Sequence, residues 1–296
     1  MERYSWAALP DAVRDAVQRH VGPATAVREV ERGQNCSIAL VVHGGQGDVF
    51  VKGVRGVSPQ MRWLRNEVAA GGLAPGVAPD VRFCADVDAE DRWFVAGFEF
   101  VHGRPAELSP GSTDLELVAA TVTGLGEFPG GVAPSLSERW NVSDWWLRWA
   151  ALTPDPATGW DLDLLTEWCH AVPGLVYGDS LLHTDLHEHQ FVIDDAGSVR
   201  VLDWGRPASG ARWVDTAFLV VRLIAAGHEP RAAEAWAETV AGWPPRSDGA
   251  VTAFACYVAG LWSYRAVTTP FPGATRLSEA AQSYLRYRLV EQPRLG

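Results

Sequence analysis

Strand-like and helix-like segments occupy different parts of this 296-residue chain, and their order limits the folds that it can adopt. Apolar or alternating runs separated by glycine-rich turns fill residues 25–101, with one conspicuous helical pattern among them at residues 58–72. Helical patterns dominate from residue 112 onward, interrupted by two short strand-like runs at 191–194 and 199–204. This order predicts an α+β fold in which a small antiparallel sheet with one helix precedes a larger, mostly helical part.

Chain length and this change of pattern together predict two domains. A chain of 296 residues exceeds the usual size of a single hydrophobic core. We place the boundary where the last strand of the N-terminal part ends, which gives an N-terminal lobe of residues 1–101 and a C-terminal lobe of residues 102–296. A short helix at residues 9–20 is expected ahead of the first strand.

Composition disfavours several classes of partner. The formal net charge of −11 is unsuited to a nucleic-acid backbone, because such a partner needs clustered lysine and arginine. The N-terminus lacks the basic and apolar regions of a signal peptide, and the longest apolar stretch, residues 250–262, is too short to span a bilayer. The four cysteines form no CxxC pair. We therefore expect a protein of the reducing cytoplasm with no nucleic-acid and no membrane partner.

Lysine is used once in this chain, although Lys and Arg together number 25. The single ammonium, Lys52, falls in the strand-like run GDVFVKGV, and Glu67 follows fifteen residues later in the predicted helix. Phosphoryl transfer needs a lysine on the phosphates and a carboxylate that fixes this lysine. Upstream, in GQNCS, Gly33 allows close backbone approach, and the amides and hydroxyls around Asn35 and Ser37 are suited to covering phosphates. These residues indicate a nucleotide site.

A dense polar segment, LLHTDLHEHQFVID at residues 181–194, interrupts the helical part. His183, Asp185 and Gln190 follow the H-x-D-L-x-x-x-N spacing of a phosphotransferase catalytic loop, except that glutamine stands in the last position. Asp203 follows on the next strand in VLDWG, where a metal-binding aspartate is expected. In this interpretation Asp185 accepts a hydrogen bond from the substrate hydroxyl, whereas Asp203 and Gln190 hold magnesium.

These segments together resemble the aminoglycoside phosphotransferase and choline kinase-like family of small-molecule kinases. The resemblance covers roughly residues 25–290 and rests on VFVKGV, RNEVAA, FEFVHGRP, LLHTDLHEHQFVID and VLDWG. It implies a protein-kinase-like two-lobed fold, ATP and magnesium as cofactors, and phosphorylation of a small-molecule hydroxyl. It also implies that backbone groups of Glu99 and Val101 hold adenine, and that Asp215 braces the catalytic loop.

The chain departs from this family's usual pattern within the catalytic loop. The family usually has asparagine where Gln190 stands and glycine where Thr184 stands, and often has Pro-Gly where Glu188 and His189 stand. Glutamine keeps the carboxamide oxygen but moves it by one methylene. A catalytically impaired nucleotide-binding or ligand-binding pseudokinase is therefore an alternative hypothesis.

A second alternative comes from the histidines of the same segment. His183, His187 and His189 alternate around Asp185, as the ligands of a metal-dependent hydrolase could, but this interpretation assigns no role to the lysine and its glutamate. We favour an ATP-dependent phosphotransferase acting on a hydroxyl of a small molecule, such as an aminoglycoside, another antibiotic or a related metabolite. The acidic net charge favours a cationic acceptor slightly.

Overall fold

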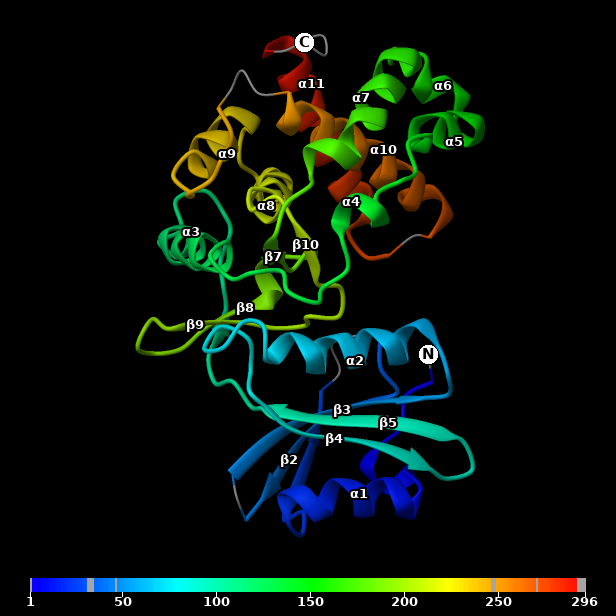
Figure 1. Ribbon diagram of the computed structural model, residues 1–296, viewed down its shortest axis with the longest axis vertical. Helices are drawn as coiled ribbons and strands as arrows, with labels where there is room; N and C mark the ends of the chain where they lie inside the picture. The colour runs from blue at the N-terminus through cyan, green and yellow to red at the C-terminus, as the bar shows by residue number, and fades with distance from the viewer. Residues whose placement is uncertain (1, 31–34, 46, 246–248, 270, 292–296) are drawn as a thin grey trace. The chain divides into compact units, whose positions relative to one another are not determined.

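The computed structural model describes residues 2–30, 35–45, 47–245, 249–269 and 271–291 (Figure 1). The chain forms two compact units. Unit 1 comprises Met1–Pro105 and His189–Pro207, and unit 2 comprises Ala106–Glu188 and Ala208–Gly296. The first unit is built on an antiparallel sheet and the second is mostly helical, which confirms the predicted two-lobed α+β fold class.

Unit 1 is built around a five-stranded antiparallel sheet with strand order β1-β2-β3-β5-β4. Its strands are β1 (Ala26–Glu29), β2 (Ile38–Gly44), β3 (Gly47–Arg55), β4 (Val81–Asp88) and β5 (Arg92–Glu99). Helices α1 (Asp11–Val21) and α2 (Pro59–Gly71) lie on opposite faces of this sheet (Figure 1). The short N-terminal helix expected at residues 9–20 is α1, and it buries Val13, Ala16, Val17 and Val21 against the sheet.

The alternation of β3 decides which of its side chains face which helix. Val49 and Val51 pack in the core on the α1 side, whereas Val54 packs in the core on the α2 side. Successive side chains of a strand point to opposite faces. Lys52 therefore shares the α2 face with Val54, and Arg55 points to the α1 face.

A small second sheet completes unit 1. It has the order β6-β8-β9, formed by β6 (Arg104–Pro105), β8 (Phe191–Ile193) and β9 (Val199–Val201). The backbone amide of Val201 donates to the carbonyl of Val77, which ties this sheet to the segment after α2. The residues that follow β9 are in this way held within unit 1.

Unit 2 is organised around one almost completely buried helix, α10 (Ala250–Thr268), in which every residue from Ala250 to Ser263 is buried. A helix that is apolar all round belongs in a core, as the sequence predicted for residues 250–262. Helices α5 (Trp145–Leu152), α7 (Leu162–Leu175) and α11 (Ala274–Glu291) pack against α10.

Two further helices and a two-stranded sheet complete the packing of unit 2. Helix α8 (Val214–Ala225) packs on α11 and on α9 (Pro230–Ala237), and strands β7 (Ser180–Leu182) and β10 (Ala208–Gly210) form a two-stranded antiparallel sheet. The remaining helices of the unit are α3 (Asp114–Leu125), α4 (Leu136–Arg139) and α6 (Pro154–Ala157). Short 3-10 turns lie at Trp6–Ala8 in unit 1 and at Glu188–Gln190, where the two units join along the chain.

A buried ion pair joins two of the unit 2 helices. Arg288 of α11 donates to Glu234 of α9 at 2.8 Å, and these side chains are 1% and 0% exposed. The hydroxyl of Tyr284 donates to the same glutamate at 2.9 Å, and Thr252 of α10 accepts from the guanidinium. The network satisfies a charge pair that would otherwise be costly to bury. No helix among the described residues is long and apolar enough to cross a membrane.

Candidate active site

Lys52 lies between two carboxylates within unit 1. Its ammonium donates to both carboxylate oxygens of Glu67 on α2, at 2.8 and 3.1 Å, and also to the carboxylate of Asp203. The side chains of Lys52 and Glu67 are each 12% exposed, whereas that of Asp203 is 50% exposed. The structure therefore brings together the lysine, the glutamate and the second aspartate that the sequence singled out.

Burial and charge act in opposite directions on this cluster. Burial lowers the pKa of Lys52, but the carboxylates of Asp203 and Glu67 outweigh burial and raise this pKa above its ordinary value. Burial raises the pKa of Glu67, and the ammonium opposes this shift. Lys52 is therefore positively charged at neutral pH, and its ammonium is held in place by Glu67 and Asp203.

One face of α2 contacts the segment that follows Asp203. Trp63, Asn66 and Glu67 lie at positions i, i+3 and i+4, and so they share a face of the helix. The Asn66 side chain donates to the carbonyl of Gly205 at 3.2 Å, and the Arg206 guanidinium lies 4.4 Å from the centre of the Trp63 ring. Sequence reasoning missed Trp63 and Asn66, although their helical spacing from Glu67 was visible.

Asp203 and Gln190 offer oxygen donors on adjacent parts of unit 1. The backbone amide of Leu202 donates to the carbonyl of Gln190 at 2.8 Å, so the two residues stand on neighbouring backbone segments. Gln190 is 5% exposed and supplies a carboxamide oxygen, and Asp203 supplies a carboxylate. Magnesium prefers oxygen ligands and often takes one or two carboxylates together with substrate phosphates. The chemical types of these two donors therefore match those that magnesium prefers.

In unit 2, helix α8 anchors the loop at residues 183–188 by its first turn. The carboxylate of Asp215 accepts the backbone amides of His183 at 2.7 Å and of Thr184 at 2.8 Å, and this aspartate is 2% exposed. Burial raises the pKa of Asp215, while His183 and the two donated hydrogen bonds act against this shift. The side chain of His183 accepts from the amide of Asp185 at 3.3 Å, which gives this histidine a structural part in the loop.

Thr184 adopts a backbone conformation that β-branched residues rarely take. Its φ is 65°, in the left-handed region where glycine is least strained. Arg139 of α4 donates to its hydroxyl at 2.9 Å, and Asp215 accepts its amide. The usual glycine of the similar family would fit this φ without strain, so the departure noted in the sequence has a physical cost here.

Asp185 is 51% exposed, and its carboxylate lies 3.5 Å from the guanidinium of Arg222. Arg222 is in the last turn of α8, seven residues after Asp215, and its guanidinium lies 5.5 Å from the centre of the Trp262 ring on α10. Positions seven apart share a face of a helix, so α8 contacts the loop at both of its ends. Sequence analysis missed Arg222; its spacing from Asp215 was the available signal.

The remaining predicted residues occupy separate places. Gly33 lies outside the described residues, and Asn35 is exposed. The hydroxyl of Ser37 accepts the amide of Arg55 at 3.1 Å, so it is engaged at the end of β3. The amide of Glu99 donates to the carbonyl of Asp80 at 2.8 Å, so an adenine contact by Glu99 would have to use its carbonyl. Val101, just beyond β5, is half-buried.

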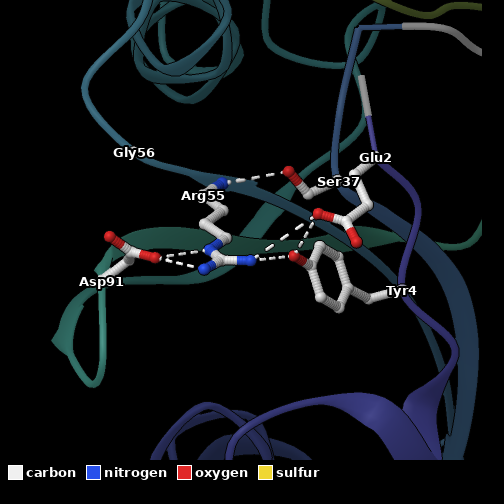
Figure 2. A pocket seen from close by; sticks show the side chains of 6 residues that line it. All are labelled: Glu2, Tyr4, Ser37, Arg55, Gly56 and Asp91. Carbon is white, nitrogen blue, oxygen red and sulfur yellow. Dashed lines mark hydrogen bonds and ion pairs between the residues drawn. The ribbon is translucent and has the colours of Figure 1, made fainter.

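A polar pocket of unit 1 lies around Arg55 and includes Ser37 in its lining (Figure 2). Arg55 donates to Asp91 at 2.6 Å and to the hydroxyl of Tyr4, and its guanidinium is also 3.7 Å from Glu2. These contacts fasten the N-terminal segment to the end of β3 and to the turn between β4 and β5. Because Arg55 points to the α1 face of the sheet, this pocket is separate from the lysine cluster on the α2 face.

Among the described residues, no group of three or more His, Cys, Asp or Glu side chains is arranged to hold a metal ion. The loop histidines therefore give the hydrolase alternative no geometric support, and His183 is engaged with the amide of Asp185.

Solved structures similar to this chain include several small-molecule phosphotransferases. The microcompartment-associated aminopropanol kinase is 18% identical, with 96% of this chain and 99% of that chain covered at a TM-score of 0.64. Macrolide 2′-phosphotransferase MphH from Brachybacterium faecium is 18% identical, with 93% and 98% covered at a TM-score of 0.54. A thermostable mutant of aminoglycoside phosphotransferase APH(4)-Ia, in a ternary complex with ADP and hygromycin B, is 12% identical, with 95% and 99% covered at 0.60.

These likenesses confirm the predicted fold at the level of three-dimensional structure. The chain has the two-lobed, kinase-like fold that aminoglycoside phosphotransferases, a macrolide phosphotransferase and an aminopropanol kinase share. No protein-family model matches the sequence, and no curated protein sequence matches it either.

Proposed function

We propose that this protein is an ATP-dependent phosphotransferase that moves the γ-phosphate to a hydroxyl group of a small molecule. The observation that carries the proposal is the cluster in unit 1, where the only lysine of the chain is held by a helix glutamate beside a loop aspartate. A fixed ammonium beside metal-binding oxygens is what phosphoryl transfer needs, because its catalysis depends on alignment and charge neutralisation.

In this proposal, residues of unit 1 bind the nucleotide and residues of unit 2 position the acceptor hydroxyl. In unit 1, Lys52 contacts the α and β phosphates, Glu67 keeps its ammonium in place, and the backbone of Glu99 and Val101 contacts adenine. In unit 2, Asp185 accepts a hydrogen bond from the acceptor hydroxyl and aligns its oxygen for attack. Asp215 supports this step, since it holds the two amides that precede Asp185 in the loop.

Magnesium would be held by the carboxylate of Asp203 and the carboxamide oxygen of Gln190, together with phosphate oxygens. When bound, it neutralises negative charge on the transferring group. Lys52 contacts Asp203 directly in this structure, so binding of the nucleotide and its metal must redistribute these contacts. Gln190 has the correct donor atom, and whether its longer side chain slows the reaction is an experimental question that a single substitution answers.

The acceptor is a hydroxylated small molecule in this proposal. One protein of the same fold was crystallised with hygromycin B, and others are named for macrolide and aminopropanol substrates. An aminopropanol carries an amine beside its hydroxyl, which agrees with the slight preference for cationic acceptors suggested by the net charge of −11. A panel of hydroxylated amines, aminoglycosides and macrolides is therefore the first choice for a screen.

The test is phosphate transfer from ATP to this panel, followed by mass spectrometry of the acceptor and by ADP release. Asp185→Asn is expected to lower turnover by about 10²-fold or more while nucleotide affinity stays within about twofold. Lys52→Met is expected to weaken nucleotide binding. Asp195→Asn, in the exposed turn between β8 and β9, is the matched control and should leave both unchanged. Full turnover in Asp185→Asn would refute the assignment.

The pseudokinase alternative predicts a different outcome of the same assay. A thermal shift with ATP, but no transfer to any acceptor and no magnesium-dependent ADP release, would favour a protein that binds nucleotide without turnover. Gln190→Asn then distinguishes a loop with impaired catalysis from a loop with no catalytic activity. A sharp rise in phosphate transfer would show that the native glutamine limits the reaction.

A further inference from the structure

Arg222 has an environment that a purely structural side chain would not need. Its guanidinium lies within unit 2, 20% exposed, and its Nε is buried without a hydrogen-bond partner among the residues that the structure describes. Burial lowers the pKa of Arg222, and the acidic Asp185 and Glu188 oppose this shift. An incompletely satisfied charge of this kind destabilises the fold, and an apolar residue at the same position would cost less.

The indole ring of Trp262 limits the orientation of this guanidinium. The Trp262 ring lies 5.5 Å from it, is 7% exposed and is packed against Phe218 of α8. A guanidinium over an indole face is stabilised by a cation–π contact. The packing of α8, which carries Arg222, against α10, which carries Trp262, therefore orients the guanidinium in advance. Its Nη2 extends to the carboxylate of Asp185.

The sequence neighbours of Asp185 are held by their backbone. Its own amide and those of the two residues before it are hydrogen-bonded, whereas its carboxylate is half-exposed and contacts Arg222. A planar guanidinium beside one carboxylate oxygen restricts the side-chain torsions of Asp185 and directs the other oxygen away from the arginine. The same positive charge offsets the repulsion that a carboxylate would exert on an incoming phosphoryl group.

We propose that Arg222 is a positioning residue that fixes the Asp185 carboxylate for its contact with the acceptor hydroxyl. The inference rests on the proposed function for its catalytic consequence, whereas the contact itself can be tested without it. Arg222 acts through Asp185 and has no part in nucleotide binding, which belongs to residues of unit 1. The effect therefore falls on kcat and leaves the KM for ATP unchanged.

The kinetic experiment compares Arg222→Met, Arg222→Lys and wild type with the acceptor found in the screen. Arg222→Met should lower kcat by about 10-fold to 10²-fold, with the KM for ATP within about twofold. Arg222→Lys should recover little, because an ammonium on a flexible stem lacks the planar fork that stacks on Trp262. In the Asp185→Asn background, Arg222→Met should cause no further loss.

Arg212 provides the matched control. This arginine precedes α8, has a buried Nε like that of Arg222, and pairs with Glu127 at 2.6 Å. Arg212→Met should affect stability and leave kcat within about twofold. A kcat for Arg222→Met within twofold of wild type, or one lowered equally by Arg212→Met, would overturn the positioning role.

A second experiment separates failure of this inference from failure of the proposed function. Thermal unfolding of Arg222→Met, Asp185→Asn and the double variant forms a double-mutant cycle that requires no activity. We expect the melting temperatures to be non-additive by about 2 °C or more. Additive shifts would show that the two side chains do not interact and would overturn the inference, whatever the enzyme assay shows.

Discussion

Removal of the Asp215 carboxylate is the sharpest test of how unit 2 holds its loop. Asp215→Ala leaves the amides of His183 and Thr184 without the acceptor that they now reach at 2.7 and 2.8 Å, in a place where the aspartate is 2% exposed. A fully buried N–H without a partner costs about 1–3 kcal/mol, so the sum is at most about 2–6 kcal/mol, because the Thr184 amide is only partly buried. Because burial raises the pKa of Asp215, its charge is itself costly, and we expect the lower half of that range.

The assay is urea unfolding followed by tryptophan fluorescence, together with hydrogen exchange of the two loop amides. Asp215→Asn keeps one acceptor oxygen and should cost about half as much as the alanine variant. Exchange of the His183 and Thr184 amides should accelerate by about tenfold or more in Asp215→Ala, since their opening no longer breaks a bond to a carboxylate.

Asp194 is the matched control for this measurement. Its carboxylate also accepts two backbone amides, those of Ala196 at 2.9 Å and Ser198 at 2.8 Å, but it does so in an exposed turn. Water can replace the carboxylate there, so Asp194→Ala should cost about 1 kcal/mol or less. An Asp215→Ala variant no less stable than Asp194→Ala would refute the argument that burial makes these two hydrogen bonds important.

Three further outcomes are expected. A thiol reagent at about pH 8 should titrate one group in the native protein, the exposed Cys84, because the other three thiols are buried and burial raises the pKa of Cys169 to about 12; a second fast-reacting thiol would contradict this. Arg288→Met should cost about 3–5 kcal/mol in thermal unfolding, against about 1 kcal/mol for Tyr284→Phe, because only the former leaves a buried carboxylate without its cation; equal costs would count against a buried ion pair. The pKa of Lys52 is raised in the folded protein, so the charged lysine contributes fully to the free energy of unfolding below the ordinary lysine pKa of about 10.4, and this contribution is lost only above that pH. The difference in free energy of unfolding between wild type and Lys52→Met should therefore stay constant from about pH 7 to about pH 9. A difference that shrinks in this range would contradict the raised pKa.

The long elements of the fold could be predicted because their patterns are local. The apolar run at 250–262 is too short for a membrane span and too uniform for a surface helix, and the structure places it as the buried centre of unit 2. The two- and three-residue strands β6, β7 and β10 were not predicted, because so few residues carry no periodicity, whereas the equally short β8 and β9 were indicated by the turn signal between them. Their pairing depends on contacts between segments that are distant in the sequence, and a single sequence does not show these contacts.

The sequence could predict which candidate residues lie close together where residue type is restrictive, but it could not predict the direction of individual side chains. A lone lysine, a helix glutamate and a strand-end aspartate form a combination that few functions besides phosphate binding require, and the structure brings Lys52, Glu67 and Asp203 together. Ser37 was chosen for its hydroxyl, but the structure engages this hydroxyl with the amide of Arg55. Arg222 was missed because arginine is common in this chain, and only the folded helix shows which arginine meets the loop.

Among the residues that the structure describes, two that are not glycine have a left-handed φ: Thr184 at 65° and Asp203 at 60°. Each belongs to a segment to which the proposed function assigns chemistry. Such conformations cost about 1–3 kcal/mol and persist only where surrounding contacts enforce them. Asp215 and Arg139 hold the amide and hydroxyl of Thr184, and Lys52 contacts the carboxylate of Asp203. At Thr184 the contacts from α8 and α4 support this backbone conformation against the preference of a β-branched residue, so local propensity predicts it wrongly. It follows that substitutions in α8 should reshape the loop more than conservative changes within it, which is the reason that Asp215 is the more informative target.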